Sequence, residues 1–115
     1  KRHLDRALAY GDGEFTLDDI RRLCRARDMQ LFMVGDGKGI QGAGVTQIVR
    51  YPRKLYLDLV LWAADRPLDE YLHLFAAIEH WAKTLGAIPR LFGRRGWGRK
   101  LPNYRATYTV FVRSP

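Results

Sequence analysis

The sequence has almost no cysteine, since Cys24 is the only one among 115 residues. A single thiol excludes an internal disulfide and a thiolate zinc site, and in an apolar helical stripe it is expected to be a small core residue. The sequence also lacks any apolar run near the roughly 18 to 20 residues that a membrane span needs, and no signal-type segment opens it. We therefore expect a soluble, unexported protein that binds no metal and no membrane.

Acidic residues are missing from the last 30 positions. Residues 1–85 have a net charge of +1, whereas residues 86–115 carry seven basic side chains and no acid, so they account for seven of the eight net charges. Such a one-signed segment attracts nucleic acid, a cofactor phosphate or an acidic protein face, and charge alone does not choose among them. A solvated basic surface without a partner is the structural alternative.

The N-terminal part predicts two helices. Residues 3–10 look like the end of a helix that Gly11-Asp12-Gly13 stops. Thr16 to Asp19 has the form of a capping box, so a second helix should begin there. Its predicted apolar face consists of Leu17, Ile20, Leu23 and Cys24.

Three strands in a meander are expected next. "MQLFMV" (29–34) and "VTQIVRY" (45–51) predict strands on either side of the turn "GDGKG" (35–39). "LYLDLVLWA" (55–63) alternates most clearly, and because both of its faces are mostly apolar we expect cover on both sides. The pattern places Leu55, Leu57, Leu59 and Leu61 on one face and Tyr56, Asp58, Val60 and Trp62 on the other.

The C-terminal half predicts a long helix and two more strands. The helix covers 65–86, with Asp65 near its cap and Gly86 as its stop. "AIPRLF" (87–92) should pair parallel to 55–63 because a helix joins them, and "YRATYTVFVR" (104–113) should be a final strand. The predicted core stripe of the helix is Leu68, Leu72, Phe75, Ile78, Ala82 and Leu85. The fold class is a single α/β (α+β) domain over 1–115, a mixed, mostly antiparallel sheet flanked by helices, with room for a short segment before Lys1.

This order of elements resembles the GNAT superfamily of N-acetyltransferases over nearly the whole chain. Residues 92–101, "FGRRGWGRKL", followed by Tyr104, look like the G-R-x-G-W-x-R-x-L stretch of small GNAT-like proteins of tailed bacteriophages and prophages. Glycines there let the chain turn sharply from strand to helix, and Trp97 would plug the space between helix and sheet. The arginines are not needed for a turn, so we expect them to face something negative.

The resemblance also implies where a cofactor would bind. Acetylating relatives rest the acetyl-CoA pyrophosphate on backbone amides of a Q/R-x-x-G-x-G/A loop between the fourth strand and the next helix. The matching stretch, "AADRPLDEYL" (63–72), has no glycine, and Pro67 removes one amide donor. Asp65, Asp69 and Glu70 would repel a diphosphate. We therefore expect no cofactor, and acetyl-CoA only if a divergent site holds it.

Asp58 is the one weak candidate for a catalytic residue. Many relatives use an acid on this strand as base, and Asp58 could activate an amine if its apolar neighbours raised its pKa. A hydrogen-bonded structural aspartate is the favoured interpretation. Tyr104 matches the aromatic that starts the final strand, which is a packing position, better than the tyrosine acid of relatives.

Three other signals are discounted. Residues 37–42 satisfy G-x-G-x-x-G, but they lead into a strand instead of a helix, which favours a hairpin turn. His73 and His80 lie seven apart, which is no known metal spacing. Trp81 is interpreted as an aromatic that packs at the rim.

Two functions are carried forward, with a weaker third. The first is a phage GNAT-like protein with a degenerate acetyl-CoA loop, located in the virion or the bacterial host cytoplasm, that contacts other phage structural proteins and possibly DNA phosphates. The second is a divergent N-acetyltransferase that uses acetyl-CoA, and the third is a nonspecific nucleic-acid-binding module. The candidate interaction and anion-binding residues are Arg94, Arg95, Trp97, Arg99, Lys100 and Arg105.

Overall fold

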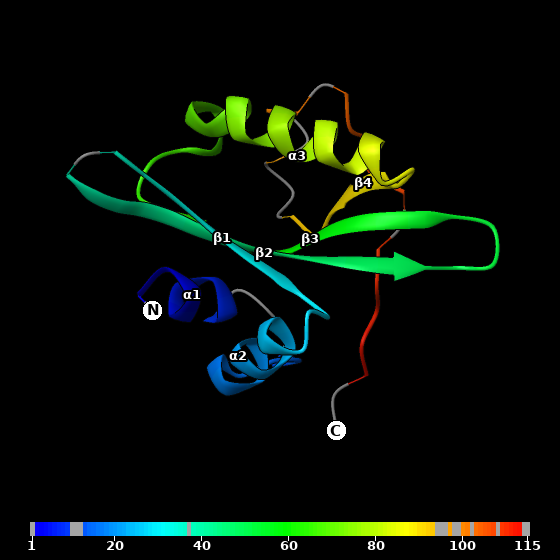
Figure 1. Ribbon diagram of the computed structural model, residues 1–115, viewed down its shortest axis with the longest axis horizontal. Coiled ribbons are helices and arrows are strands. Elements are labelled where there is room, and N and C mark those ends of the chain that lie inside the picture. Colours follow the sequence, from blue (N-terminus) through cyan, green and yellow to red (C-terminus); the bar gives the residue numbers. More distant parts are fainter. Residues whose placement is uncertain are drawn as a thin grey trace.

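A four-stranded mixed sheet with helices on both faces forms the molecule (Figure 1). The computed structural model describes residues 2–9, 13–36, 38–93, 97, 100–101, 103–107 and 109–113. The strand order is β1-β2-β3-β4, with antiparallel pairs except for the parallel pair β3–β4. The elements are α1 (Arg2–Ala9), α2 (Leu17–Arg25), β1 (Gln30–Asp36), β2 (Gly39–Arg50), β3 (Leu55–Ala64), the 3-10 helix η1 (Leu68–Tyr71), α3 (Leu72–Thr84) and β4 (Ile88–Leu91).

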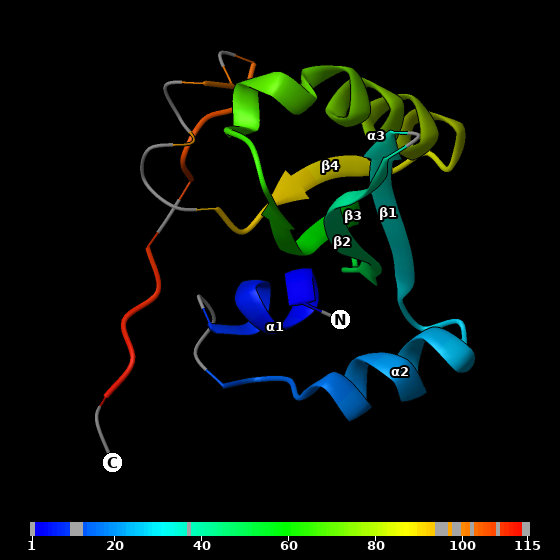
Figure 2. The same ribbon diagram turned by 90° about the vertical axis from the view of Figure 1, so that its left-hand side faces the viewer.

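The two faces of the sheet are covered by different helices, as the apolar faces of 55–63 predicted. Helix α3 lies on one face, and α1 and α2 lie on the other (Figures 1 and 2). Helix α2 begins at the predicted capping box, in which Asp19 N–H donates to Thr16 Oγ1 at 3.2 Å and Thr16 N–H donates to Asp19 Oδ2 at 2.9 Å. Cys24 packs against the core as expected. Among the described residues, no helix has the length and apolar character needed to cross a membrane.

A β-bulge reverses the side-chain pattern along β3. Val45 pairs with Leu61 while Thr46 pairs with Leu59, so Val60 is an extra residue in the ladder. One extra residue moves every following side chain to the other face. Leu61 therefore joins the core under α1, and Trp62 joins Leu59 under α3. The prediction that Leu61 shares a face with Leu55, Leu57 and Leu59 is therefore wrong.

The long helix begins later than predicted. Residues 65–67 are irregular, η1 forms one tight turn, and α3 begins only at Leu72, so Asp65 is not near a helix cap. The predicted core stripe is wrong at Leu72 and Leu85, which are 43% and 38% exposed, and Tyr71 is buried instead. Gly86, with φ +69°, ends the helix as predicted.

The predicted final strand is wrong. Residues 104–107 and 109–113 belong to no strand, and Figure 2 shows this segment leaving the sheet beyond β4. Val110, Phe111 and Val112 are 70%, 92% and 70% exposed. An alternating sequence gives strand propensity, but a strand also needs an edge to pair with, and the segment does not lie along one here. The hairpin interpretation of 37–42 is confirmed, because β1 and β2 pair through Asp36 and Gly39.

Candidate functional site

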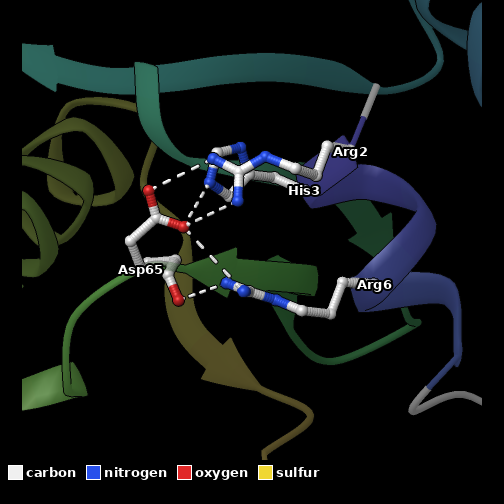
Figure 3. Close-up of polar contacts among 5 residues, drawn as sticks. Arg2, His3, Arg6 and Asp65 are labelled. Atoms are coloured by element: carbon white, nitrogen blue, oxygen red, sulfur yellow. Dashed lines mark hydrogen bonds and ion pairs between the residues drawn. The ribbon is translucent and has the colours of Figure 1, made fainter. Parts of the chain in front are cut away.

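The connection from β3 to α3 meets helix α1 at Asp65 (Figure 3). Asp65 directly follows β3, and its N–H donates to Gln41 O at 2.8 Å, which continues the pairing with β2. Helix α1 faces this connection with three cationic or protonatable side chains spaced within one turn. They are Arg2, His3 and Arg6.

All three side chains converge on the carboxylate of Asp65. Arg2 donates through both Nη atoms, at 3.2 Å to Oδ1 and 3.3 Å to Oδ2. His3 Nε2 lies 3.0 Å from Oδ1, and Arg6 Nη1 lies 3.9 Å from it. Arg6 also donates to the carbonyl of Ala64, which ties α1 to the end of β3.

The cluster keeps Asp65 ionised. Hydrogen bonds from Arg2 and then from His3 hold the pKa of the Asp65 carboxyl below its usual value of 3.8. The His3 side chain is only 6% exposed, whereas that of Arg2 is 67% exposed. A pocket of about 260 Å³ opens beside Arg2 and His3, over apolar side chains of β1 and β2.

The other acids of the connection are also paired. Glu70 accepts from Arg66 Nε at 3.3 Å, and Asp69 accepts from Lys100 Nζ at 3.4 Å. Pro67 precedes η1 and no glycine occurs in 63–72. The carboxylates of this connection are therefore paired with cationic side chains. The connection has no glycine that would let a ligand approach its backbone amides closely.

Asp58 lies at a second polar site, on the face of β3 opposite α3. Its partner is Arg90, which stands directly opposite it in the parallel register of β3 and β4. Arg90 Nε donates to Oδ1 at 2.7 Å and Nη2 donates to Oδ2 at 2.6 Å, and Asp58 is only 2% exposed. The Arg90 Cζ also lies 4.2 Å from the ring centroid of Tyr56. The aspartate matches the structural interpretation favoured from the sequence, and its role as a base stays a prediction.

Arg90 itself was not predicted as the partner. It was counted with the basic C-terminal segment, but Asp58 neutralises it and further raises its pKa. The signal was present in the sequence, because parallel pairing of 55–63 with 87–92 brings an acid and an arginine together near the middle of both strands.

The structure describes only part of the predicted contact surface. Arg94, Arg95 and Arg99 lie outside the described residues. Trp97 is half-buried, packs against the core under α3, and covers Gly93 so closely that a Cβ there would lie 2.2 Å from the indole. Lys100 and Arg105 are exposed.

The histidines of helix α3 belong to no metal-binding cluster of described residues. His73 and His80 are both exposed on α3. Within the part of the chain that the structure describes, no three His, Cys, Asp or Glu side chains are grouped closely enough to hold a metal ion.

Strands β3 and β4 stop pairing at Leu59, several residues before β3 reaches Asp65. Their register runs from Tyr56 and Ile88 to Leu59 and Leu91, and Phe92 N–H donates to Leu59 O at 3.3 Å. β3 continues to Ala64 after β4 has ended at Leu91. Among the described residues, the end of β3 that leads to Asp65 is therefore paired with β2 only.

No family model and no curated protein matches this sequence. Solved structures do match. A GNAT family acetyltransferase from Staphylococcus aureus has a TM-score of 0.71 at 14% identity, covering 98% of this chain and 85% of that one. An aminoglycoside acetyltransferase from an uncultured soil metagenomic sample, in complex with sisomicin, has a TM-score of 0.71 at 12% identity, covering 99% and 87%. A Thermus thermophilus protein has a TM-score of 0.65 at 18% identity, covering 99% and 92%.

These similarities extend over the whole chain, and identities below one fifth carry the fold and not the activity. The chain has a GNAT-like fold, as its order of elements predicted. The resemblance of residues 92–101 to phage proteins is not shown by these structures and stays a prediction.

Proposed function

We propose that this chain is a GNAT-like protein that binds other proteins and does not transfer acetyl groups. The observation that supports this most strongly is the Asp65 cluster. In acetylating members of the superfamily, the connection between these elements holds a diphosphate on backbone amides. Here the connection carries a carboxylate, and the side chains of Arg2, His3 and Arg6 already contact it.

The charges explain why a diphosphate would bind poorly. A cofactor phosphate placed at the connection would have to displace Asp65 from the three side chains of α1 or lie beside it. Displacement breaks the hydrogen bonds from Arg2 and His3 to Asp65 and leaves its carboxylate without these partners. A phosphate that lies beside Asp65 is repelled by the carboxylate, because both groups are negatively charged.

The state of Asp58 supports the same proposal. A general base must be able to accept a proton from an incoming amine. Both oxygens of Asp58 accept from Arg90, and the carboxylate is almost fully buried. We therefore assign Asp58 to the stability of the β3–β4 pair.

We propose that the partner is another structural protein of a tailed phage. The support is the likeness of residues 92–101 to phage GNAT-like proteins, together with exposed cations near this segment. Lys100 and Arg105 are exposed, and Arg94, Arg95 and Arg99 lie in the same stretch of sequence. Arginine suits such contacts because its planar fork pairs with carboxylates.

Calorimetry with acetyl-CoA tests the first part of the proposal. We expect no binding heat up to millimolar cofactor, both for the natural sequence and for Asp28→Asn, a control change at an exposed acid between α2 and β1. Micromolar binding that Arg2→Gln or Arg66→Gln weakens would overturn it, because those residues belong to or follow the Asp65 cluster.

A mass-spectrometric inventory of purified particles tests the second part. We expect the chain in tailed-phage particles, and we expect Lys100→Glu with Arg105→Glu to reduce its incorporation. Arg53→Glu with Lys54→Glu is the matched control, because these two exposed cations lie in the β2–β3 turn. Particles that lack the natural chain would contradict the assignment of the partner.

A divergent N-acetyltransferase is the second candidate. The observation in its favour is that β3 extends beyond the end of β4, so that no described residue pairs with that side of β3 near Asp65. Transfer of an acetyl group from acetyl-CoA to an amine, with release of the free thiol, would establish this function in place of the first.

A further inference from the structure

The face of the sheet opposite α3 is only partly covered by helices. The buried cluster under α1 and α2 takes its sheet residues from one end of β2 and β3, including Val45 and Leu61. Toward the β2–β3 turn, both strands run on past these helices (Figure 1). Three large side chains on the uncovered part are exposed, Tyr51 at 46%, Ile88 at 45% and Phe92 at 54%. Apolar side chains gathered in this way mark an interaction surface.

Arg90 holds the aromatic rings of this surface together. Its Cζ lies 4.2 Å from the ring centroid of Tyr56, 5.3 Å from that of Tyr51 and 5.2 Å from that of Phe92. Tyr51 and Tyr56 also meet edge to face, with their centroids 5.6 Å apart. Arg90 is fixed in turn by both oxygens of Asp58. The rings are therefore ordered before any ligand binds. We name this surface the Arg90 face and define it as Tyr51, Tyr56, Ile88, Arg90 and Phe92.

Strand register explains why these side chains share one face. In the parallel pair of β3 and β4, Tyr56 stands opposite Ile88, and in the same register Asp58 stands opposite Arg90. Side chains two positions apart along a strand share a face, so all four lie opposite α3. Arg90 Nη2 also donates to the hydroxyl of Tyr51 at 3.3 Å, which places that ring on the same face.

Basic residues border the Arg90 face at the β2–β3 turn. Residues 41–57 carry three cations and no acid. Tyr51 N–H donates to Lys54 O at 2.8 Å, which closes the turn and sets two exposed cations, Arg53 and Lys54, beside Tyr51. Strand β4 comes from residues 86–115, which contain no acid at all. Charge complementarity therefore favours an anionic ligand.

The contacts of Arg90 argue against an acidic protein surface as that ligand. An arginine recognises a carboxylate best through its free planar fork. Nε and Nη2 of Arg90 already donate to Asp58, so this fork is occupied. The exposed rings of Tyr51 and Phe92 remain accessible, with separate cations at the border. Nucleic-acid bases stack on aromatic rings of this kind while lysine and arginine contact the phosphates.

We propose that the Arg90 face binds single-stranded nucleic acid, with bases stacked on Tyr51 and Phe92 and phosphates bound by Arg53 and Lys54. Stacking on a ring requires an unpaired base, which a single strand offers and a duplex does not. Rings and phosphate contacts serve RNA and DNA alike. The proposed function does not depend on this binding, because the Arg90 face includes neither the Asp65 cluster nor the cations of residues 94–105.

Fluorescence anisotropy with labelled oligothymidine and oligouridine of about 15 nucleotides tests the proposal on the full chain. We expect at least one of them to bind, and we expect Tyr51→Ala and Phe92→Ala each to weaken binding at least about fivefold. Trp81→Ala is the matched control and should leave the affinity unchanged, because Trp81 is a 37% exposed aromatic on α3, across the sheet.

The salt dependence separates the rings from the cations. Each phosphate contact to a single strand contributes about 0.7 to the slope of the logarithm of the binding constant against the logarithm of salt concentration. Arg53→Gln with Lys54→Gln should therefore reduce the slope by up to about 1.4. Phe92→Leu keeps an apolar side chain without a ring, so it should weaken binding as Phe92→Ala does and leave both the slope and the melting temperature unchanged.

Four results would overturn the proposal. The first is that neither strand binds at up to about 100 μM protein. The second is an equal loss of affinity in Trp81→Ala and Phe92→Ala, and the third is full affinity in Phe92→Leu. The fourth is displacement of the bound strand by polyglutamate at the same concentration of charge, which would identify an acidic protein surface as the ligand instead.

Discussion

At the scale of single residues, the Asp58–Arg90 ion pair should have the largest effect on stability. Asp58 is 2% exposed, so removal of its partner leaves a buried charge without compensation. We expect Arg90→Met to lower the free energy of unfolding by about 3–5 kcal/mol. Urea unfolding followed by fluorescence measures this. Arg50→Met, at an exposed position of β2, should change it by less than about 0.5 kcal/mol, and an equal loss in both variants would contradict the assignment.

Asp65 should make the stability depend on acid pH. Its pKa in the folded state lies below the ordinary 3.8 because Arg2 and His3 bond the carboxylate. Its contribution to stability is therefore present in full above about pH 3.8 and is lost as the pH falls through the lower, folded-state value. We expect Asp65→Asn to lower the melting temperature at pH 6 and to match the natural chain at the most acidic pH. A constant difference at every pH would contradict this, and Asp28→Asn is the control.

The two aspartates differ in how far the sequence could predict them. The partner of Asp58 follows from strand register, since parallel pairing of two recognisable strands places Arg90 beside it. The partners of Asp65 come from α1, about 60 residues away in the sequence, and only the packing of α1 against the sheet brings them there. A sequence contains no local signal for a contact of that kind.

At the scale of secondary-structure elements, the Phe32 ring of β1 packs directly over Gly44 of β2. Phe32 is its register partner, and a Cβ on Gly44 would lie 2.3 Å from the Phe32 ring. Gly44→Ala should therefore displace the ring, which stacks on Trp62, and cost about 1–3 kcal/mol. The cost should be smaller when Phe32→Leu has already removed the ring. Urea unfolding of the double-mutant cycle measures the coupling, and additive losses would exclude the contact as the cause.

Local signals predicted the elements well, and pairing between elements explains the failures. The capping box at Thr16 and the stop at Gly86 depend only on neighbouring residues, and both are present. The bulge at Val60 depends on how β2 and β3 register, which the alternation of 55–63 cannot reveal. Residues 104–107 and 109–113 have strand propensity, but they pair with no strand in the described part of the chain.

At the scale of the whole molecule, the order of elements was enough to predict a GNAT-like fold. The distribution of charge along the sequence, by contrast, predicted more unpaired basic side chains than the structure has. Arg90 is neutralised by Asp58 and Lys100 pairs with Asp69, although both were counted among the seven basic residues of the last 30. Arg105 and Arg113 are exposed. Net charge along a sequence therefore predicts a surface only when partners from other elements are known.

The difference between the paired cations and the exposed arginines allows a test of the nucleic-acid hypothesis. If the chain binds duplex DNA through phosphates, the logarithm of the binding constant should fall linearly with the logarithm of salt concentration, by about 0.9 for each phosphate contact. Arg105→Gln with Arg113→Gln should reduce that slope by up to about 1.8, because both cations are free to meet phosphates. Arg90→Lys should leave it unchanged, since Asp58 already balances that charge. Fluorescence anisotropy of a labelled duplex in a salt series measures the slope, and a flat response of the natural chain would exclude DNA as a partner.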